Sequence, residues 1–244
     1  MATVPDMVVT VDAKQAAEDL AKLARSHAPG ETMDAMMGRL ATRVQPATIV
    51  DVGSSNGCWS EMARRHWPAA KLLCIEADAR HWPALEVFAA RTGAHVVRAM
   101  AGDHVGVGNF AASPTDPFGG TGRVDALPDT KPTNCTTVDH EVERLALPAP
   151  FLLKLDTHGF EPWILNGAAN VLRGACALVI EAYTCTLQPG AFRFWELCRY
   201  LEERGFLPTD MADPMWRPLD GRLWQTDLAF ERADVPQVGE GRYR

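Results

Sequence analysis

The sequence predicts an α/β fold built around a doubly wound, mostly parallel β-sheet, with additional helices at the N-terminus. Short apolar runs rich in β-branched residues alternate along the chain with amphipathic segments. The runs are apolar at nearly every position, as in strands that are covered on both faces. Hydrophobic residues make up 47% and charged residues 23% of the 244 residues, which is the balance of an ordinary globular protein with a full core.

The expected elements follow one another as strand, helix and strand. Strands are expected at 47–53, 71–77, 95–101, 151–156, 177–183 and 224–230. Helices are expected at 12–27, 31–43, 60–67, 81–93, 138–145, 162–174 and 192–206. The stretch 102–137, rich in Gly, Pro, Ser, Thr and Asn, is expected to be a long loop that is either functional or mobile.

The chain divides into three parts. Residues 1–45 form an N-terminal helical segment, 46–230 the main domain, and 231–244 a polar tail. The N-terminal helices are expected either to cover a pocket or to pair two subunits. The sequence therefore leaves open whether the protein is a monomer or a homodimer.

Charge and composition limit the partners. The net charge of −7 and pI of about 5.5 argue against nucleic acid and anionic lipid. No apolar stretch reaches the roughly 18 residues of a membrane span. The first residues show no signal-peptide pattern. The six scattered cysteines contain no CxxC pair, so free thiols in a reducing compartment are expected. These features predict a cytoplasmic protein that acts on a small molecule, without a zinc site.

The clearest candidate site is the turn after the first strand of the main domain. Parallel sheets bind ligands beyond the carboxyl ends of their strands. The turn has the pattern D-x-G-x-x-x-G, whereas dinucleotide folds use G-x-G-x-x-G to hold a pyrophosphate. The observed pattern suits S-adenosylmethionine, which has no phosphate and needs polar contacts at its amino-acid end. The candidate residues are Asp51, Gly53, Ser54, Ser55, Asn56 and Gly57.

The next two strands end in further candidates for a nucleoside pocket. Glu76 lies about 20 residues beyond the turn, where a carboxylate holds the two ribose hydroxyls in such folds. Ala77, Met100 and Ala101 are the candidates to line the adenine, and Asp103 to bind its edge. A solvated strand end explains Glu76 as well, and core packing with an ordinary turn explains the other residues.

The fourth strand of the main domain contains a buried charge. Lys154 lies inside an apolar run, on the same face of the strand as Asp156. A buried lysine requires an acidic partner, for which Asp156, Glu161 and Glu181 are the candidates. Asp156 and His158 follow at the carboxyl edge, where the methyl group of the cofactor is expected to lie.

These motifs resemble the FkbM family of S-adenosylmethionine-dependent methyltransferases. The resemblance covers about residues 48–230. Besides the glycine turn it rests on K-x-D-x-x-G-x-E-x-x-x-L-x-G (Lys154, Asp156, Gly159, Glu161, Leu165, Gly167), Thr137-Val138-Asp139, Val179-Ile180-Glu181 and Gln225-Thr226-Asp227. It implies a Rossmann-like sheet of the class I methyltransferase type. It further implies S-adenosylmethionine as cofactor and O-methylation of a small-molecule, sugar or lipid hydroxyl in biosynthesis.

The chain departs from this family at two places. The family commonly reads D-V-G-A-N-x-G at the turn, whereas this chain has Ser55 and Asn56, so its Asn is displaced by one position. The family commonly has Glu or Gln where this chain has His158. The first difference affects the contacts of the turn, and the second affects proton transfer.

His158 is the expected general base, because an imidazole titrates near neutral pH. Asp156 is expected to orient it or to bind cofactor or acceptor, and Lys154 to lower the pKa of the acceptor. The alternative role of His158 is to cap the following helix or to pack against it. Asp156, His158 and Glu181 are also suitable ligands for a divalent ion, but their spacing does not require one, and no metal is predicted.

The acceptor is expected to contact residues from a lid and from the strand ends. The lid candidates are Phe110, Ser113 and Phe118 in the segment 109–122, and the strand-end candidates are Glu161, Glu181 and Tyr183. A plain flexible insertion explains the segment equally well.

Three other functions fit parts of the pattern. A nucleotide-dependent oxidoreductase on a Rossmann-like fold requires a phosphate cradle that this glycine spacing does not provide. An RNA methyltransferase is disfavoured by the acidic charge. A non-catalytic S-adenosylmethionine-binding module is disfavoured by the retained Lys154, Asp156 and Glu161.

Overall fold

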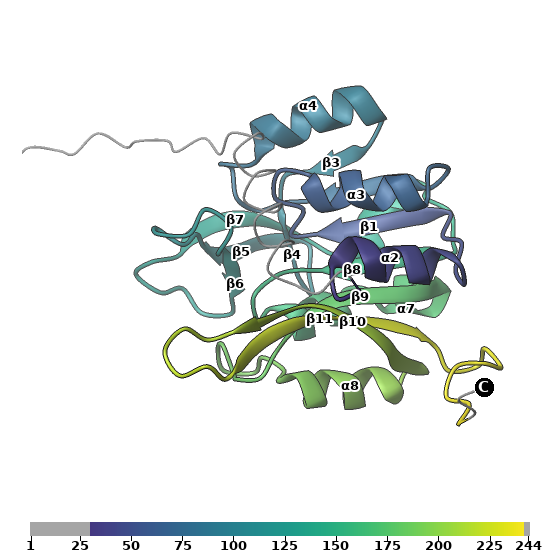
Figure 1. The fold of residues 1–244 in the computed structure, drawn as a ribbon. Helices are drawn as coiled ribbons and strands as arrows, with labels where there is room; N and C mark the ends of the chain where they lie inside the picture. The colour runs from purple at the N-terminus through teal and green to yellow at the C-terminus, as the bar shows by residue number, and fades with distance from the viewer. Residues whose placement is uncertain (1–29, 242–244) are drawn as a thin grey trace, which may run out of the picture.

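A computed structural model describes residues 30–241 as two β-sheets with helices around the larger one (Figure 1). The larger sheet has seven strands in the order β10-β11-β9-β8-β1-β2-β3. Its strands are β1 (Thr48–Val52), β2 (Lys71–Ile75), β3 (His95–Val97), β8 (Phe151–Leu155), β9 (Ala175–Tyr183), β10 (Phe206–Trp216) and β11 (Leu223–Arg232). Strands β3, β2, β1, β8 and β9 are parallel, and β11 runs antiparallel to β9 and β10. The predicted mostly parallel sheet is confirmed.

Helices cover both faces of this sheet, so the fold is doubly wound as predicted. One face packs against α2 (Met33–Ala41), α3 (Cys58–His66) and α4 (Trp82–Thr92). The other packs against α5 (Val138–Arg144), α6 (Glu161–Asn166), α7 (Ala169–Gly174) and α8 (Phe194–Glu202). Neighbouring residues of one strand pack on opposite faces of the sheet. In β8, Leu152 packs on the face covered by α2, α3 and α4, and Leu153 on the face covered by α5, α6, α7 and α8. This explains why the strands are apolar at nearly every position.

The expectation of an uninterrupted loop at 102–137 is wrong, because the stretch contains three strands of a second sheet. The strands of this sheet are β4 (Met100–Ala101), β5 (Gly106–Ala111), β6 (Thr121–Arg123) and β7 (Lys131–Thr136), in the order β4-β7-β5-β6. The predicted strand 95–101 is therefore divided between the two sheets. The glycines serve packing: a Cβ at Gly108 would lie 2.3 Å from Met100 Cε, and one at Gly122 would lie 3.0 Å from Met100 Sδ.

Three smaller differences have local causes. Strand β10 was not predicted because it contains Pro208 and Pro214, which an edge strand tolerates. The helix predicted at 162–174 is divided into α6 and α7 at Gly167, where a Cβ would lie 2.0 Å from the carbonyl oxygen of Gly102. Strand β11 continues to Arg232, two residues into the predicted tail. The helix predicted at 12–27 lies outside the described residues.

The small sheet lies beyond the carboxyl ends of the central strands (Figure 1). The ends of β1, β2, β8 and β9 therefore face it across a shared space. In the part of the chain that the structure describes, no helix combines the length and the apolar character needed to cross a bilayer.

Candidate active site

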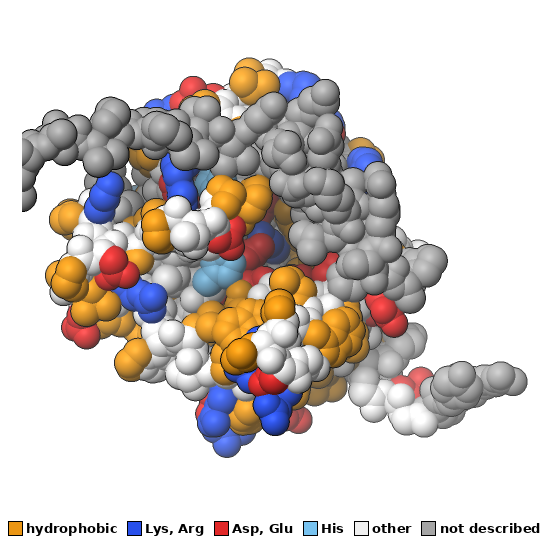
Figure 2. Space-filling view, turned by 60° about the vertical axis from the view of Figure 1, so that its left-hand side comes forward, with side chains coloured by type: hydrophobic (Ala, Val, Ile, Leu, Met, Phe, Trp, Pro, Cys, Tyr) orange, Lys and Arg blue, Asp and Glu red, His pale blue; other side chains and the backbone are white. Residues whose placement is uncertain are grey.

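A cavity of about 890 Å³ lies at the carboxyl edge of the large sheet. On this face of the molecule, histidine and acidic side chains gather in a hollow between apolar ones (Figure 2). The structure brings most of the predicted site residues together in the cavity wall: Gly53, Ser54, Ser55, Asn56, Glu76, Ala77, Met100, Ala101, Phe110, Phe118, Lys154, Asp156, His158, Glu181 and Tyr183. The glycine turn and the end of β8 thus face one space.

Asp51 and Gly57 are predicted cofactor contacts that do not line the cavity. Asp51 is fully buried beneath it, where Ser60 Oγ donates a hydrogen bond to Oδ2 at 2.7 Å. Gly57 has φ +83°, and a Cβ there would lie 3.1 Å from the ring of Phe88. Both residues therefore support the turn from beneath the cavity.

Glu161, Ser113 and Asp103 also lie outside the cavity wall. Glu161 is buried and accepts hydrogen bonds from Thr157 Oγ1 and from the backbone N–H of Gly159, both at 3.0 Å, so it holds the exit of β8. Ser113 Oγ accepts from the backbone N–H of Asp116 at 3.0 Å within its own loop. Asp103 is exposed and pairs with His104. In the structure these three residues make contacts within the chain.

At Gly53, the turn after β1 lies directly against the end of β8. The φ of Gly53 is +73°, and a Cβ on this residue would lie 2.0 Å from the carbonyl oxygen of Asp156. The backbone N–H of Asp156 donates to the carbonyl of Val52 at 3.1 Å, and Lys154 Nζ lies 3.3 Å from the carbonyl oxygen of Gly53. Only glycine allows this approach and this backbone conformation together.

Glu76 accepts two backbone hydrogen bonds on the other side of the turn. Its Oε2 accepts from the backbone N–H of Ser55 at 2.6 Å, and its Oε1 accepts from that of Asp78 at 2.7 Å. Burial raises the pKa of Glu76 to about 7, although the two N–H groups act in the opposite direction. Each carboxylate oxygen keeps a further lone pair for a hydroxyl donor.

Two buried donors in the cavity wall have no hydrogen-bond partner among the described residues. They are Asn56 Nδ2 and Trp59 Nε1. Asn56 Oδ1 accepts from the backbone N–H of Cys58 at 3.1 Å, which fixes the orientation of the amide. Unsatisfied buried donors are costly, so this wall fits a ligand with acceptor atoms. Trp59 was not predicted as a site residue, because its helical position alone indicates core packing.

The buried Lys154 lies between two carboxylates. Its Nζ is 3.3 Å from Asp51 Oδ1 and 3.1 Å from Asp156 Oδ2. Burial alone would lower the pKa of Lys154, but these two charges overcome it and raise that pKa. Asp156 was among the predicted partners, and Asp51 was not. Asp51 is the cross-strand partner of Lys154 in the β1–β8 register, which a sequence pattern does not reveal.

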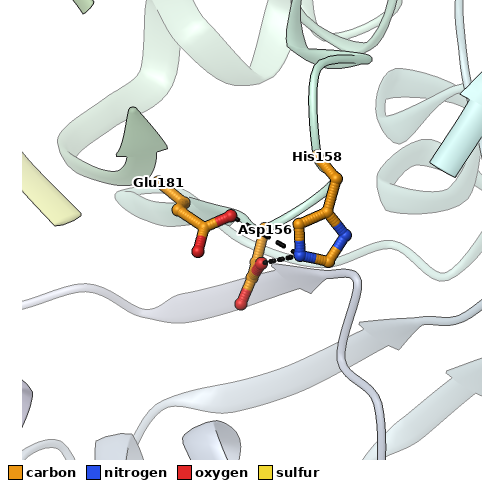
Figure 3. A group of neighbouring side chains, drawn as sticks. All are labelled: Asp156, His158 and Glu181. Carbon is orange, nitrogen blue, oxygen red and sulfur yellow. Dashed lines mark ion pairs between the residues drawn. The ribbon is translucent and has the colours of Figure 1, made fainter. Parts of the chain in front are cut away.

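His158 lines the cavity, and one edge of its ring faces both Asp156 and Glu181 (Figure 3). It has φ +53°, and its Nδ1 donates to the carbonyl oxygen of Gly120, the residue before β6, at 2.8 Å. Its Nε2 lies 3.5 Å from Asp156 Oδ1 and 3.6 Å from Glu181 Oε2. The hydrogen bond at Nδ1 therefore leaves Nε2 as the nitrogen that faces the two carboxylates.

Acidic groups are concentrated around Glu181. Tyr183 Oη donates to Glu181 Oε2 at 2.5 Å, and the amide of Gln225 donates to Oε1. Asp227 faces the cavity from β11, opposite Glu181 in the β9–β11 register. Burial and the charge of Asp156 raise the pKa of Asp227 to about 8, and burial together with Asp156 and Asp227 raises that of Glu181. Gln225 and Asp227 were recognised only as part of a family pattern.

The small sheet and the loop before β6 close the remaining wall. Phe118 stacks on His81 with ring centroids 5.8 Å apart, and His81 Nε2 donates to the carbonyl oxygen of Pro117 at 2.9 Å. Thr121 Oγ1 lies 3.1 Å from the carbonyl oxygens of Thr157 and His158. His81 is buried, because the loop between β5 and β6 covers it.

Comparisons with known proteins show the fold. No family model matches the sequence, and no curated protein matches it. The structure of cofactor-bound Rv0187 from MTB matches with a TM-score of 0.50 and 12% identity over 93% of each chain. The methyltransferase FkbM from Methylobacillus flagellatus KT matches with a TM-score of 0.47 and 16% identity, over 75% of this chain and 43% of that chain. A putative O-methyltransferase from Klebsiella pneumoniae has a TM-score of 0.47, with 14% identity over 92% of this chain and 91% of that chain.

The chain has the Rossmann-like α/β fold of the class I methyltransferase type. Its large sheet has the strand order β10-β11-β9-β8-β1-β2-β3, with β11 antiparallel to both of its neighbours. The fold positions a site at the carboxyl edge of the sheet, and the chemistry of that site depends on the residues described above.

Proposed function

We propose that the protein is an S-adenosylmethionine-dependent methyltransferase that methylates a hydroxyl group of a small-molecule, sugar or lipid acceptor. The main support for the proposal is the close contact at Gly53 between two segments of the chain. There the turn after β1 and the end of β8 approach so closely that one cavity serves both. A cofactor on the turn and an acceptor beside Asp156 and His158 would be adjacent.

The turn fits the cofactor better than it fits a dinucleotide. The backbone N–H of Ser55 is already bonded to Glu76, so it is not available to a phosphate. Glu76 retains lone pairs for two ribose hydroxyls, and Ala77, Met100 and Ala101 supply an apolar wall for the adenine. Asn56 Nδ2 and Trp59 Nε1 are donors suited to a carboxylate. When bound, S-adenosylmethionine supplies a methyl group activated by its sulfonium charge.

Asp156 and His158 are proposed to bind the acceptor hydroxyl and to take up its proton. Lys154 fixes the Oδ2 atom of Asp156 and leaves Oδ1 facing the cavity. In the neutral imidazole, Nε2 of His158 carries a lone pair, because the proton resides on Nδ1. His158 can therefore accept the hydroxyl proton while Asp156 orients the hydroxyl for an in-line displacement.

The acceptor half of the cavity favours a neutral or positively charged molecule. Asp156, Glu181 and Asp227 all line it, and the charge of Lys154 is already balanced by two carboxylates. A phosphate backbone would be repelled here, which supports a small-molecule acceptor over RNA. Phe110, Phe118 and Tyr183 provide the apolar contacts.

The test is methyl transfer from labelled S-adenosylmethionine to a panel of small hydroxyl compounds. We expect transfer to at least one class of acceptor, and a loss of at least about 100-fold in kcat for His158→Ala. The matched control is His140→Ala, because His140 is exposed on α5 and distant from the cavity wall.

Three results would contradict the proposal. Tight binding of S-adenosylmethionine without transfer to any acceptor would indicate a binding module. Binding of NAD(P) in place of S-adenosylmethionine would indicate an oxidoreductase. Full turnover by His158→Ala would remove His158 from the proton step.

A further inference from the structure

Three atoms with available lone pairs converge in the acceptor half of the cavity. They are Asp156 Oδ1, His158 Nε2 and Glu181 Oε2, and one ligand atom from each residue lies within 4.8 Å of the others. The two distances from Nε2, 3.5 and 3.6 Å, are longer than the roughly 2.7–3.2 Å of an N–H···O hydrogen bond. Nε2 therefore makes no hydrogen bond to either carboxylate, and the three side chains face one another across a common space (Figure 3).

The outer side of each group is already held by another residue. His158 Nδ1 donates to Gly120, which fixes the ring and the tautomer. Lys154 holds the other oxygen of Asp156, and Tyr183 and Gln225 hold Glu181. Outer hydrogen bonds that orient an imidazole and its carboxylate neighbours are typical of metal sites.

A positive charge would be stabilised at the point where the three atoms meet. Lys154 is the nearby lysine, but its ammonium group lies between Asp51 and Asp156 and is balanced there. Glu181 is buried with only 8% of its side chain exposed, so its charge is poorly screened by solvent. A bound cation would neutralise this excess of negative charge.

We propose that Asp156, His158 and Glu181 bind a divalent cation of the Mg²⁺ or Mn²⁺ class. One imidazole and two carboxylates are suitable ligands for such an ion, and three protein ligands leave coordination positions for water and an acceptor oxygen. Its part in catalysis rests on the proposed function: the cation would lower the pKa of an acceptor hydroxyl bound beside it, and solvent water would take up the proton. In the loaded site His158 is a ligand, and it accepts a proton only when the cation is absent.

The experiment measures binding of Mn²⁺ alone to protein that was dialysed against EDTA, by calorimetry and by electron paramagnetic resonance. We expect one site per chain and a pulsed-resonance coupling between Mn²⁺ and an imidazole nitrogen. The variants His158→Ala and Glu181→Gln should weaken binding by about 10–100-fold, and His158→Ala should abolish the nitrogen coupling. The controls His140→Ala and Glu143→Gln change exposed residues of α5 and should bind as wild type.

The result that would overturn the proposal is Mn²⁺ binding that is absent, or equal in wild type and in folded Glu181→Gln protein. Circular dichroism checks the folding of each variant. Binding with nitrogen coupling but no methyl transfer would support the metal site and contradict the proposed function. Methyl transfer by protein that binds no Mn²⁺ and is insensitive to EDTA would support the function and contradict the metal site.

Discussion

The turn after β1 and the acidic corner, formed by Asp156, Glu181 and Asp227, line the same cavity. Their polar groups are stabilised in different ways. At the turn, the Glu76 carboxylate is held by two backbone N–H groups, and the charge of Asp78 raises its pKa less than burial does. At the other corner, Asp156, Glu181 and Asp227 lie together, and their pKa values influence one another. Backbone hydrogen bonds hold the Glu76 carboxylate at the turn, whereas interactions between charged groups dominate at the acidic corner.

This difference indicates what each half recognises. Backbone groups at fixed positions suit a ligand of constant shape, such as a nucleoside. Clustered carboxylates with an imidazole suit a positive charge, and they can take up or release protons. Substitutions at the turn should therefore act on cofactor affinity, whereas those at the acidic corner should act on turnover and on pH dependence.

The largest effect is expected where the two halves meet, from Gly53→Ala. The new Cβ would collide with the carbonyl oxygen of Asp156, and alanine also disfavours the positive φ. We expect a loss of at least about 3 kcal/mol in the free energy of unfolding, measured in urea. The matched control is Gly93→Ala, where φ is +76° and nothing lies within 4 Å of the Cβ position; it should lose only about 1–2 kcal/mol. Equal losses would show that the close approach at Gly53 is unimportant.

The next effect concerns the charge that holds the acidic corner. Lys154→Met removes the counter-charge of two buried carboxylates and should cost about 3–5 kcal/mol of unfolding free energy. Lys71→Met, at the exposed start of β2, serves as control and should change stability by less than about 0.5 kcal/mol. If Lys154→Met were as stable as wild type, the ion-pair account of this corner would fail.

A smaller effect is expected at Glu76, whose carboxylate is held by backbone N–H groups at the turn. Glu76→Gln should weaken binding of S-adenosylmethionine by about 10-fold, because a neutral amide is a poorer acceptor for ribose hydroxyls. Glu86→Gln, exposed on α4, is the control and should leave the dissociation constant unchanged. Unchanged affinity in Glu76→Gln would remove this residue from the cofactor site.

Glu76 also predicts a pH dependence of stability. Burial raises its pKa from 4.5 to about 7 in the folded protein, so folding favours the protonated form. This contribution is present below pH 4.5 and is lost as the pH rises to about 7. Relative to Glu76→Gln, wild type should lose about 1–3 kcal/mol between pH 4.5 and pH 8 in urea unfolding. A constant difference between the two proteins across this range would contradict the shifted pKa.

The smallest effect is expected in the small sheet. Phe118 is 39% exposed and stacks on His81, so Phe118→Ala should change stability little, by about 0.5 kcal/mol. Its ring lines the cavity, and its loss should raise the KM for the acceptor several-fold. Leu127→Ala removes an exposed side chain that is not in the cavity wall and should leave KM unchanged. An equal effect of both variants would exclude a specific contact.

The large sheet could be predicted from sequence because its strands are short, continuously apolar and separated by amphipathic helices. The small sheet could not, because β5 and β6 contain glycines that carry no periodic signal. Those glycines are explained by the volume of Met100, a contact between residues distant in the chain. Strand β10 was missed for a similar reason, since its prolines are tolerated only at the edge of the sheet.

The candidate site could be predicted where side chains follow strand ends, as with Glu76, Asp156 and His158. Strand register was not accessible, so the pairing of Lys154 with Asp51 was missed. The burial of His81 was also missed, because it depends on the loop between β5 and β6. Sequence patterns thus located the edge of the sheet where the chemistry lies, whereas the partner of each charged group required the tertiary structure.

The central claim is that one cavity binds a sulfonium nucleoside beside an acidic corner. Calorimetric titration of the full chain with S-adenosylmethionine, compared with NAD(P), tests it most directly. We expect one S-adenosylmethionine per chain, weaker binding in Glu76→Gln, and no heat from NAD(P). A protein that binds NAD(P) and shows no heat with S-adenosylmethionine would contradict the account.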